Sequence, residues 1–565
     1  MVDLKNNFVR NIPDSPQYLS RIEQEINILE KLKAVDFLLE VSKICAATKH
    51  IPRTIRGSAG SSLLAWALGI NDLDPIKWGI PIERFMNELR KDLPDVDLDF
   101  PHDERDKVFD ILNKMYPGKV GRITNHVIYH EKSALREALR IMGYRKKVPA
   151  NFKISDIMPQ DEQTVYEIAS NLQDTVRSLD LHCGGAIIFD TKVPEELIIP
   201  GTADRIRYDK REVDKYKLWK VDMLSNRALS QLRDCGIRNP DEVNPADPDV
   251  AELLSRGDSF GLTQAESPAF KKILRAIKPK NVRELALCMG LVRPAAAWRG
   301  HRAMFVENWE KTRTSHHLVF EDDANSAISA LTGVTLEEAD SIRKAFSKQD
   351  YDGIEKFKRR LDSKPETAAL VHDLESFKEF SMCESHAVAY AKITWALAYA
   401  KMHDPKSFWH STLNNAISMY RPWVHIRQAV LSGLRIQEGR SPWIREGDEL
   451  YNTGHMNRLF EVSASDEYNS LGYWTSRPFL PECRSEVNEF GEFTVSGLVA
   501  ITRIVKFSNR PTTFVTLGYD NGLYVDVVVS GAYDLKKVNK IKCQGTMNKK
   551  YGSEWIEASK LHIIS

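Results

Sequence analysis

An acidic stretch near residue 95 restricts the fold more tightly than any other part of the sequence. In residues 93–100, LPDVDLDF, apolar and acidic side chains alternate, with Val96, Leu98 and Phe100 on one side and Asp95, Asp97 and Asp99 on the other. Alternation with a period of two is typical of a β-strand that buries one face. Alternate residues on a strand lie about 6.6 Å apart, so the three carboxylates form one row. Asp is disfavoured in strands, and a row of this kind needs either solvent or a cation beside it.

A second strand supplies a further carboxylate. In KLWKVDML, residues 217–224, the alternation of Trp219 and Val221 places Lys220 and Asp222 on the same face. Two carboxylates two residues apart, with a third on another strand, can hold two Mg²⁺ ions that act on an in-line phosphoryl displacement. The lysine could neutralise the charge of a triphosphate. The alternatives are a solvated strand edge for the acidic row and a surface or helix-capping role for Asp222.

The bulk composition is that of a multidomain globular protein. A chain of 565 residues favours about three or four domains, and 42% hydrophobic with 28% charged residues excludes a disordered or fibrous protein. Neither a long apolar run nor a signal-peptide pattern occurs, so we expect a cytoplasmic protein. The seven cysteines stand singly, which argues for a reducing compartment and against structural zinc. Because the net charge is only +1, any binding of nucleic acid must use local basic stripes.

Other patterns predict the organisation along the chain. A helix is predicted to start at Ser15 and Pro16, and the small-residue loop RGSAGSS from Arg56 runs into an apolar helix whose first N–H groups would face an anion. A plain tight turn is the alternative for that loop. Residues 132–142 predict a helix with one basic face, carrying Lys132, Arg136 and Arg140, which is commonly just a solvated surface. Short β-rich runs from Phe493 onward predict a small five-stranded barrel.

Many of these segments resemble motifs of one protein family, and they occur in the family's order. The matching segments of the first half are YLSRIEQEINIL from Tyr18, RGSAGSSLLAW from Arg56, ERF from Glu83, LPDVDLDF from Leu93, KSALREALRIMG from Lys132, HCGGAII from His182 and KVDML from Lys220. Those of the second half are FGLTQAES from Phe260, LVRP from Leu291, LEEADSIRKAFSK from Leu336 and SMCESHAVAYA from Ser381. The chain thus resembles the bacterial C-family DNA polymerases, typified by the DNA polymerase III alpha subunit, over nearly its whole length.

The resemblance implies a multidomain α/β and α fold. It contains a nucleotidyltransferase-type mixed-sheet palm, a helical thumb, large helical fingers and a C-terminal five-stranded barrel of the oligonucleotide-binding (OB) type. The expected boundaries are palm at 1–131 and 178–225, thumb at 132–177, fingers at 226–420, a helical connector at 421–490 and the barrel at 491–565.

The resemblance also implies the residues of the site. Asp97, Asp99 and Asp222 are expected to be the catalytic carboxylates and the ligands of two Mg²⁺ ions, with Mn²⁺ as the alternative metal, and Asp95 is not expected to be a ligand. The residues expected to bind the incoming nucleotide are Gly57, Ser58, Arg84, Lys220, Arg343, Lys344, Lys348 and His386, the last with a buried core histidine as its alternative. The basic face made by Lys132, Arg136 and Arg140 lies in the expected thumb, where it would contact phosphates of the duplex.

The expected function is therefore extension of a primer on template DNA with deoxynucleoside triphosphates. The sequence departs from the family at GSAGSS, which has one glycine fewer, and at Arg293-Pro294-Ala295-Ala296, where the family has RPGP. The family's N-terminal phosphoesterase-like domain is not found, so we expect no proofreading nuclease, and the size fits a polymerase carried by a virus or mobile element. A sliding clamp or other replisome proteins are further expected partners. Two alternatives stay open: a template-independent nucleotidyltransferase and a non-catalytic DNA-binding scaffold.

Overall fold

The computed structural model describes most of the chain. The described residues are 4–89, 95–144, 159–297, 300–313, 318–361, 365–379, 381–436, 443–452, 485–488, 491–507, 510–519, 523–550 and 553–564. They divide into two compact units. The first unit comprises Met1–Arg90, Asp99–Glu104 and Asn226–Ser565, and the second comprises Lys91–Leu98 and Arg105–Ser225. Each unit is described separately below.

The predicted acidic strand is present as β2 (Val96–Pro101), and the predicted lysine–aspartate strand is β5 (Lys220–Asn226). Both strands begin in the second unit and end in the first. They belong to a five-stranded sheet with the order β1-β2-β5-β4-β3, whose remaining strands are β1 (Thr54–Arg56), β3 (Val120–Ile128) and β4 (Val176–Ile188). The apolar face of β2 is fully buried, as its alternation predicts.

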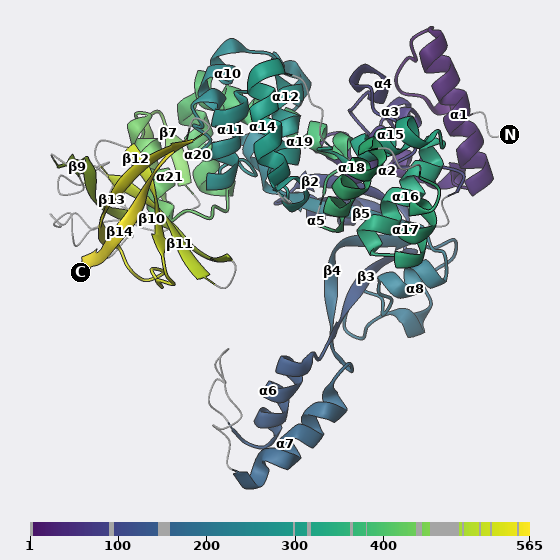
Figure 1. The fold of residues 1–565 in the computed structure, drawn as a ribbon. Coiled ribbons are helices and arrows are strands. Elements are labelled where there is room, and N and C mark those ends of the chain that lie inside the picture. The colour runs from purple at the N-terminus through teal and green to yellow at the C-terminus, as the bar shows by residue number, and fades with distance from the viewer. Residues whose placement is uncertain are drawn as a thin grey trace. The chain divides into compact units, whose positions relative to one another are not determined.

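Two small hydrophobic cores can be distinguished in the described part of the second unit. Strand β4 pairs antiparallel with β3 and with β5, and side chains around Ile123 and Ile187 form the core of this part. The helices of the unit are α5 (Arg105–Met115), α6 (Glu131–Ile141), α7 (Pro159–Leu172) and α8 (Lys210–Lys215). Helices α6 and α7 lie side by side (Figure 1) and share a separate core around Ala138 and Val165. The predicted helix at 132–142 is thus confirmed as α6.

The first α-helix of the first unit is the one predicted at Ser15 and Pro16, and a short 3₁₀ helix, Leu4–Asn7, precedes it. Helix α1 (Pro16–Leu32) has Ser15 at its N-cap and a proline in its first turn, as expected. It is followed by α2 (Val35–Ala47), a short 3₁₀ segment at Gly57–Ser61, α3 (Leu63–Ala67) and α4 (Pro75–Trp78).

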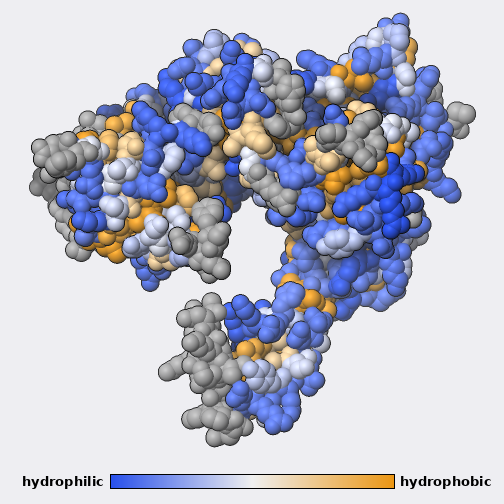
Figure 2. All heavy atoms as spheres, viewed as in Figure 1, coloured by the Kyte–Doolittle hydropathy of each residue, from blue (hydrophilic) through white to orange (hydrophobic). Residues whose placement is uncertain are grey.

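A long run of helices follows β5 in the first unit. They are α9 (Arg227–Asp234), α10 (Pro248–Ser255), α11 (Pro268–Ile277), α12 (Val282–Leu291), α13 (Pro294–Ala297), α14 (His301–Thr312), α15 (Glu321–Thr332), α16 (Leu336–Lys348), α17 (Tyr351–Lys358), α18 (Pro365–Leu374), α19 (Glu384–His403), α20 (Pro405–Asn415) and α21 (Pro422–Leu431). Helix α19 is buried on all sides, which explains why its sequence has no polar stripe. It runs through the largest hydrophobic core, whereas α15 to α18 enclose a second core around Ile328 and Phe346. The surface over α16 and α17 is strongly hydrophilic (Figure 2).

The C-terminal part of the first unit is the predicted barrel. Its five strands are β10 (Glu492–Phe507), β11 (Arg510–Tyr519), β12 (Leu523–Ser530), β13 (Lys540–Lys550) and β14 (Ser553–Ile564). Pairing of β10 with both β11 and β13 closes the sheet, and β9 (Ser485–Val487) adds to the β10 edge. Alternate residues of β12, such as Val527, fill the interior. The predicted fold class is confirmed.

The segment at 421–490 differs from the helical connector that we expected. Helix α21 is followed by a small sheet of three strands, β6 (Arg435–Ile436), β7 (Trp443–Glu446) and β8 (Glu449–Asn452). The turn formers Gly447 and Asp448 join β7 to β8 in a hairpin, a signal that outweighs helical periodicity in so short a segment. Among the described residues of this segment, only α21 is helical, and residues 437–442, 453–484 and 489–490 lie outside the described chain. None of the described helices is long and apolar enough to cross a membrane.

Candidate metal and nucleotide site

Three carboxylates and one lysine gather in the second unit. The Lys220 ammonium forms ion pairs with Asp222, on the same strand, and with Asp95 at 3.5 Å. Asp97, two residues after Asp95 on β2, lies next to the Asp222 carboxylate. Lys220 and Asp222 are buried, whereas the Asp95 side chain is 49% exposed. The cluster is open to solvent on the Asp95 side and closed on the Asp222 side.

Two glycines allow the strand that carries Asp222 to approach its neighbour. Gly185 of β4 pairs with Asp222 of β5. A Cβ atom on Gly184 would lie 2.7 Å from the Met223 carbonyl oxygen, which is backbone and cannot move aside cheaply. The glycine pair in the HCGGAII segment therefore has a structural cause, because any larger residue would push β4 away from β5.

The electrostatics of the cluster favour a bound cation. Burial, together with the neighbouring Asp222 and Asp95 carboxylates, raises the pKa of Asp97 to about 7, although Lys220 opposes the shift. The Oδ1 atom of Asp222 is buried and accepts no hydrogen bond from any residue that the structure describes. Buried polar atoms are normally paired, so this oxygen can accept a cation. Oxygen ligands in a crowded acidic site suit a hard divalent cation such as Mg²⁺.

His182 lies beside the cluster, and the sequence interpretation gave it no role. Its Nδ1 atom is 3.7 Å from Asp222 Oδ1 and accepts hydrogen bonds from the backbone N–H groups of Gly184 and Gly185. Burial lowers the pKa of the ring, so the imidazole is neutral at neutral pH. The one sequence feature that could have drawn attention to His182 is its position directly before the glycine-containing part of the HCGG segment.

Asp99 has different surroundings from the other aspartates of its row. It belongs to the first unit, where its carboxylate is completely buried. Arg56 donates two hydrogen bonds to it, at 2.9 and 3.0 Å, Asn226 donates one at 2.7 Å, and the Tyr390 hydroxyl donates one at 2.6 Å. Three of these hydrogen bonds go to Oδ2 and one, from Arg56 Nε, goes to Oδ1. Asp99 is thus a hydrogen-bonded link between β2, the end of β5 and α19.

The three partners of Asp99 were not identified from the sequence. Arg56 immediately precedes the RGSAGSS glycine, and Asn226 follows Asp222 at the end of β5, where it also caps α9. Tyr390 lies one helical turn after His386, and its ring contacts the His386 ring edge-on. All three residues lie in or beside segments that the sequence analysis had selected. Periodicity alone, however, does not show which buried carboxylate accepts hydrogen bonds from them.

The RGSAGSS loop does not present an open helix start to an anion. The backbone N–H groups of Leu63 and Leu64 both donate to the buried Glu25 carboxylate at 2.9 Å, and the next N–H group donates to the Ser62 hydroxyl. The expectation of unpaired N–H groups at the start of α3 is therefore wrong, because the Glu25 side chain of α1 accepts their hydrogen bonds. Gly57 and Ser58 precede these groups, and the Gly57 carbonyl accepts a hydrogen bond from Ser385.

Most of the predicted basic nucleotide contacts have acidic partners within the first unit. Arg84 forms an ion pair with Glu321, and Arg343 is buried against Asp340 at 2.9 Å and Glu321 at 3.5 Å. Lys344 also contacts Asp340, at 2.8 Å, whereas Lys348 is exposed at the end of α16. Only Lys348 of this set is presented directly to solvent.

His386 is mostly buried, which favours the core alternative. Burial and the nearby Arg56 and Arg293 guanidinium groups lower its pKa to about 3. The ring is therefore neutral at physiological pH and cannot supply a positive charge to a phosphate.

The basic face of α6 is present in the second unit. Lys132, Arg136 and Arg140 are all exposed, while Ala134 and Ala138 face the small core shared with α7. This arrangement leaves the three cations accessible to a polyanion. Their contact with DNA stays a prediction.

Comparison with known proteins identifies the family. The model described as the bacterial DNA polymerase III alpha NTPase domain matches residues 3–225, and the model of the finger domain of the same subunit matches residues 223–366. Together they cover more than half of the chain. The chain belongs to the bacterial C family of DNA polymerases.

Similar C-family proteins include DNA polymerase III alpha subunits and error-prone DNA polymerases. The chain is 26% identical to DNA polymerase III subunit alpha of Aquifex aeolicus over 533 residues, which covers 79% of this chain and 45% of the relative. It is 26% identical to the error-prone DNA polymerase of Bdellovibrio bacteriovorus over 491 residues, covering 76% and 46%, and 28% identical to DNA polymerase III subunit alpha of Thermus aquaticus over 464 residues, covering 70% and 38%. The chain thus spans less than half the length of these relatives. The finger model begins close to the predicted start of the fingers at residue 226, and the other domain boundaries stay predictions.

Proposed function

We propose that this C-family chain is a template-directed DNA polymerase that extends a primer 3′ end with deoxynucleoside triphosphates. The observation that carries the proposal is the carboxylate cluster of the second unit, which contains Asp97 and Asp222. Both residues were predicted as metal ligands, and the unpaired Asp222 oxygen with the raised pKa of Asp97 supports a cation there.

We infer that Asp95 is the third carboxylate of this site. The sequence interpretation assigned that place to Asp99, but Asp99 already accepts four hydrogen bonds, three at Oδ2 and one at Oδ1, from Arg56, Asn226 and Tyr390. A cation at Asp99 would compete with these donors, whereas Asp95 is half exposed and shares Lys220 with Asp222. Asp99 instead holds the end of β2 in place.

Asp97, Asp222 and Asp95 would hold two Mg²⁺ ions, with Mn²⁺ as the alternative. When bound, such ions stabilise the attacking and leaving oxygens of an in-line phosphoryl transfer. Lys220 is kept charged by Asp222 and Asp95, which raise its pKa against the effect of burial. The Lys220 ammonium can exchange its ion pairs with these carboxylates for one with a phosphate oxygen. It would therefore balance negative charge in the site both with and without bound nucleotide.

The remaining cations supply the nucleotide and DNA contacts in this proposal. Lys348 is the accessible end of a basic group in which Arg343 and Lys344 are held by Asp340. Gly57 and Ser58 would contact the nucleotide through the loop itself, because the α3 N–H groups are occupied. The α6 residues Lys132, Arg136 and Arg140 would contact duplex phosphates, which position DNA without reading its sequence.

Primer extension on a templated 5′ overhang with Mg²⁺ and all four deoxynucleotides tests the proposal. We expect the wild type to extend the primer to the template end and Asp97→Asn to lose roughly a hundredfold or more of the rate while still binding DNA. Asp180→Asn is the matched control, because Asp180 is an exposed aspartate on β4 of the same unit. Equal addition to a lone single strand would favour a template-independent transferase, and DNA binding without incorporation by the wild type would favour a scaffold.

A further inference from the structure

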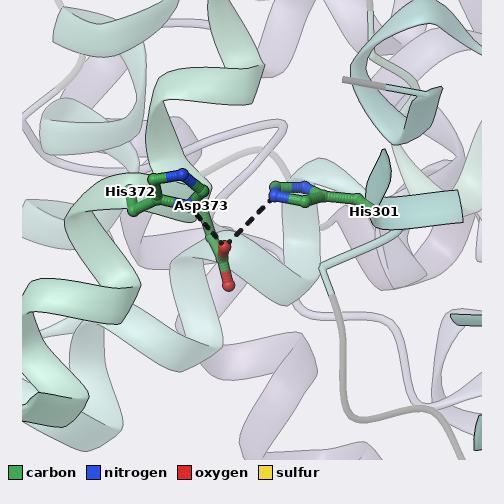
Figure 3. A group of neighbouring side chains, drawn as sticks. All are labelled: His301, His372 and Asp373. Carbon is green, nitrogen blue, oxygen red and sulfur yellow. Dashed lines mark hydrogen bonds and ion pairs between the residues drawn. The ribbon is translucent and has the colours of Figure 1, made fainter. Parts of the chain in front are cut away.

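Two histidines and an aspartate from distant parts of the sequence meet in the first unit. His301 is the first residue of α14, and His372 and Asp373 lie in the last turn of α18. The two imidazole rings point toward the Asp373 carboxylate from two sides (Figure 3). His301 is buried, His372 is 48% exposed and Asp373 is 36% exposed.

The two contacts to Asp373 are a long hydrogen bond and long ion pairs, and their lengths also match the spacing of metal ligands. His301 Nε2 and His372 Nδ1 each lie 3.4 Å from the same oxygen, Asp373 Oδ1. A well-formed N–H···O bond to a carboxylate is shorter, about 2.7–2.9 Å. A tetrahedral ion with ligand bonds of about 2.0–2.1 Å sets neighbouring ligand atoms about 3.4 Å apart. The distances from Asp373 Oδ1 to His301 Nε2 and to His372 Nδ1 therefore match two edges of such a tetrahedron.

We propose that His301, His372 and Asp373 form a site for a divalent transition-metal ion of the Zn²⁺ class. All three ligand atoms lie within 4.8 Å of one another, and the half-exposed His372 side chain can rotate to bring its ring nitrogen closer to that of His301. Two imidazole nitrogens and one carboxylate oxygen are ligands that Zn²⁺ accepts in tetrahedral sites, and they are poor ligands for Mg²⁺, which prefers oxygen. The exposed His372 and Asp373 give the ion a path from solvent and leave the fourth position to water.

The site would join two hydrophobic cores of the helical region. Helix α14 contributes Phe305 and Trp309 to the largest core, whereas α18 contributes Leu370 and Leu374 to the core enclosed by α15 to α18. An ion bound to both helices ties these cores together at the ends of α14 and α18. Metal binding of this kind adds stability because the ligands are not assembled in the unfolded chain.

The sequence could not reveal this site. The spacing of the cysteines argued against structural zinc, but a site built from histidines 71 residues apart has no local motif. The site shares no residue with the proposed catalytic cluster, so it can be tested separately from polymerase activity.

Cobalt substitution gives a direct test. Co²⁺ in a tetrahedral site with imidazole ligands has intense visible absorption, whereas Co²⁺ in a six-coordinate oxygen site absorbs weakly. We expect the full chain to show the intense bands with one equivalent of Co²⁺, to lose them on addition of Zn²⁺, and to keep them in Asp97→Asn. His372→Ala and Asp373→Asn should each abolish the bands and weaken Zn²⁺ binding, measured by calorimetry, at least about tenfold.

Matched variants and a stability readout make the result decisive. His50→Ala changes an exposed histidine elsewhere in the first unit and should leave the bands unchanged. Because His372 is half exposed, its variant should fold without metal as the wild type does, and Zn²⁺ should raise the unfolding temperature of the wild type but not of His372→Ala. Absence of the intense bands in the wild type, or their persistence in both His372→Ala and Asp373→Asn, would overturn the proposal.

Discussion

At the scale of single residues, the aspartates of β2 and the residue before it have two different roles, proposed cation binding and structural hydrogen bonding. Asp97 neighbours the Asp222 carboxylate, while Asp99, two residues later, receives four hydrogen bonds from structural donors. The alternating pattern predicted the strand and its buried apolar face correctly. It could not distinguish the members of the row, because the partners of Asp99 come from 43, 127 and 291 residues away in sequence.

This division predicts different effects on stability. Asp99→Asn removes a buried ion pair with Arg56 and should lower the free energy of unfolding by roughly 1.5–3 kcal/mol. Asp95→Asn removes a half-exposed carboxylate and should change it by less than about 1 kcal/mol. Chemical denaturation of the two variants beside the wild type measures both values. Equal effects on stability would show that Asp99 has no special structural role.

At the scale of secondary-structure elements, the start of α19 contains a buried acidic group. The Glu384 carboxylate lies near Asp322 and Asp323 of α15 and 3.6 Å from Arg283 of α12. Burial and the two aspartates raise its pKa to about 8, although Arg283 opposes the shift. The folded protein therefore holds a proton on Glu384 at neutral pH that the unfolded chain releases.

The proton on Glu384 makes stability depend on pH in a defined direction. Between the ordinary pKa of 4.5 and about 8, the folded state binds more protons than the unfolded state, so this contribution to stability falls as pH rises. Glu384→Gln stays neutral and should be more stable than the wild type above this window, by on the order of 1–3 kcal/mol. Denaturation at several pH values across the window measures the difference. A pH-independent difference between variant and wild type would contradict the assignment.

Helix α6 carries the second prediction at this scale. If Lys132, Arg136 and Arg140 bind DNA phosphates, replacing all three by Gln should reduce the slope of log affinity against log salt by about 0.9 for each phosphate that is no longer neutralised. Fluorescence anisotropy with a primer–template duplex at several salt concentrations measures the slope. The triple variant Lys356→Gln, Lys358→Gln and Arg359→Gln, on exposed positions of α17 and its C-cap, is the charge-matched comparison. An equal reduction by both triples would show that net charge, not the α6 face, sets the slope.

The elements themselves were predictable where their signals are local. Proline at the start of α1, apolar alternation in β2 and β5, and turn formers between barrel strands each act within a few residues. The helix start at α3 was misjudged because Glu25 reaches it from α1, a contact across 38 and 39 residues. The small sheet of β6, β7 and β8 was missed because strands of two to four residues give almost no period.

At the scale of the whole molecule, the order of motifs was sufficient to predict the family and the fold class. The mixed sheet, the helical region with its two cores and the closed barrel all follow from segments that the sequence shows in order. The ion pairs of Arg84 and Arg343 with Glu321 were not predictable, because basic motifs do not reveal which acidic side chains meet them in three dimensions. Fewer of the basic motif residues are therefore available to a nucleotide than the motifs imply, and the function proposed here rests mainly on the carboxylate cluster.

The most direct test of this account is the rate of single-nucleotide incorporation on a primed template with saturating Mg²⁺ for four variants: Asp95→Asn, Asp97→Asn, Asp99→Asn and Asp222→Asn. We predict that the Asp95, Asp97 and Asp222 variants fold and bind DNA normally but lose roughly a hundredfold or more of the rate, while Asp99→Asn is less stable and keeps more activity than these three at a temperature where it is folded. An Asp99→Asn variant that is folded and as inactive as Asp97→Asn, together with an Asp95→Asn variant of normal rate, would contradict the proposed carboxylate set.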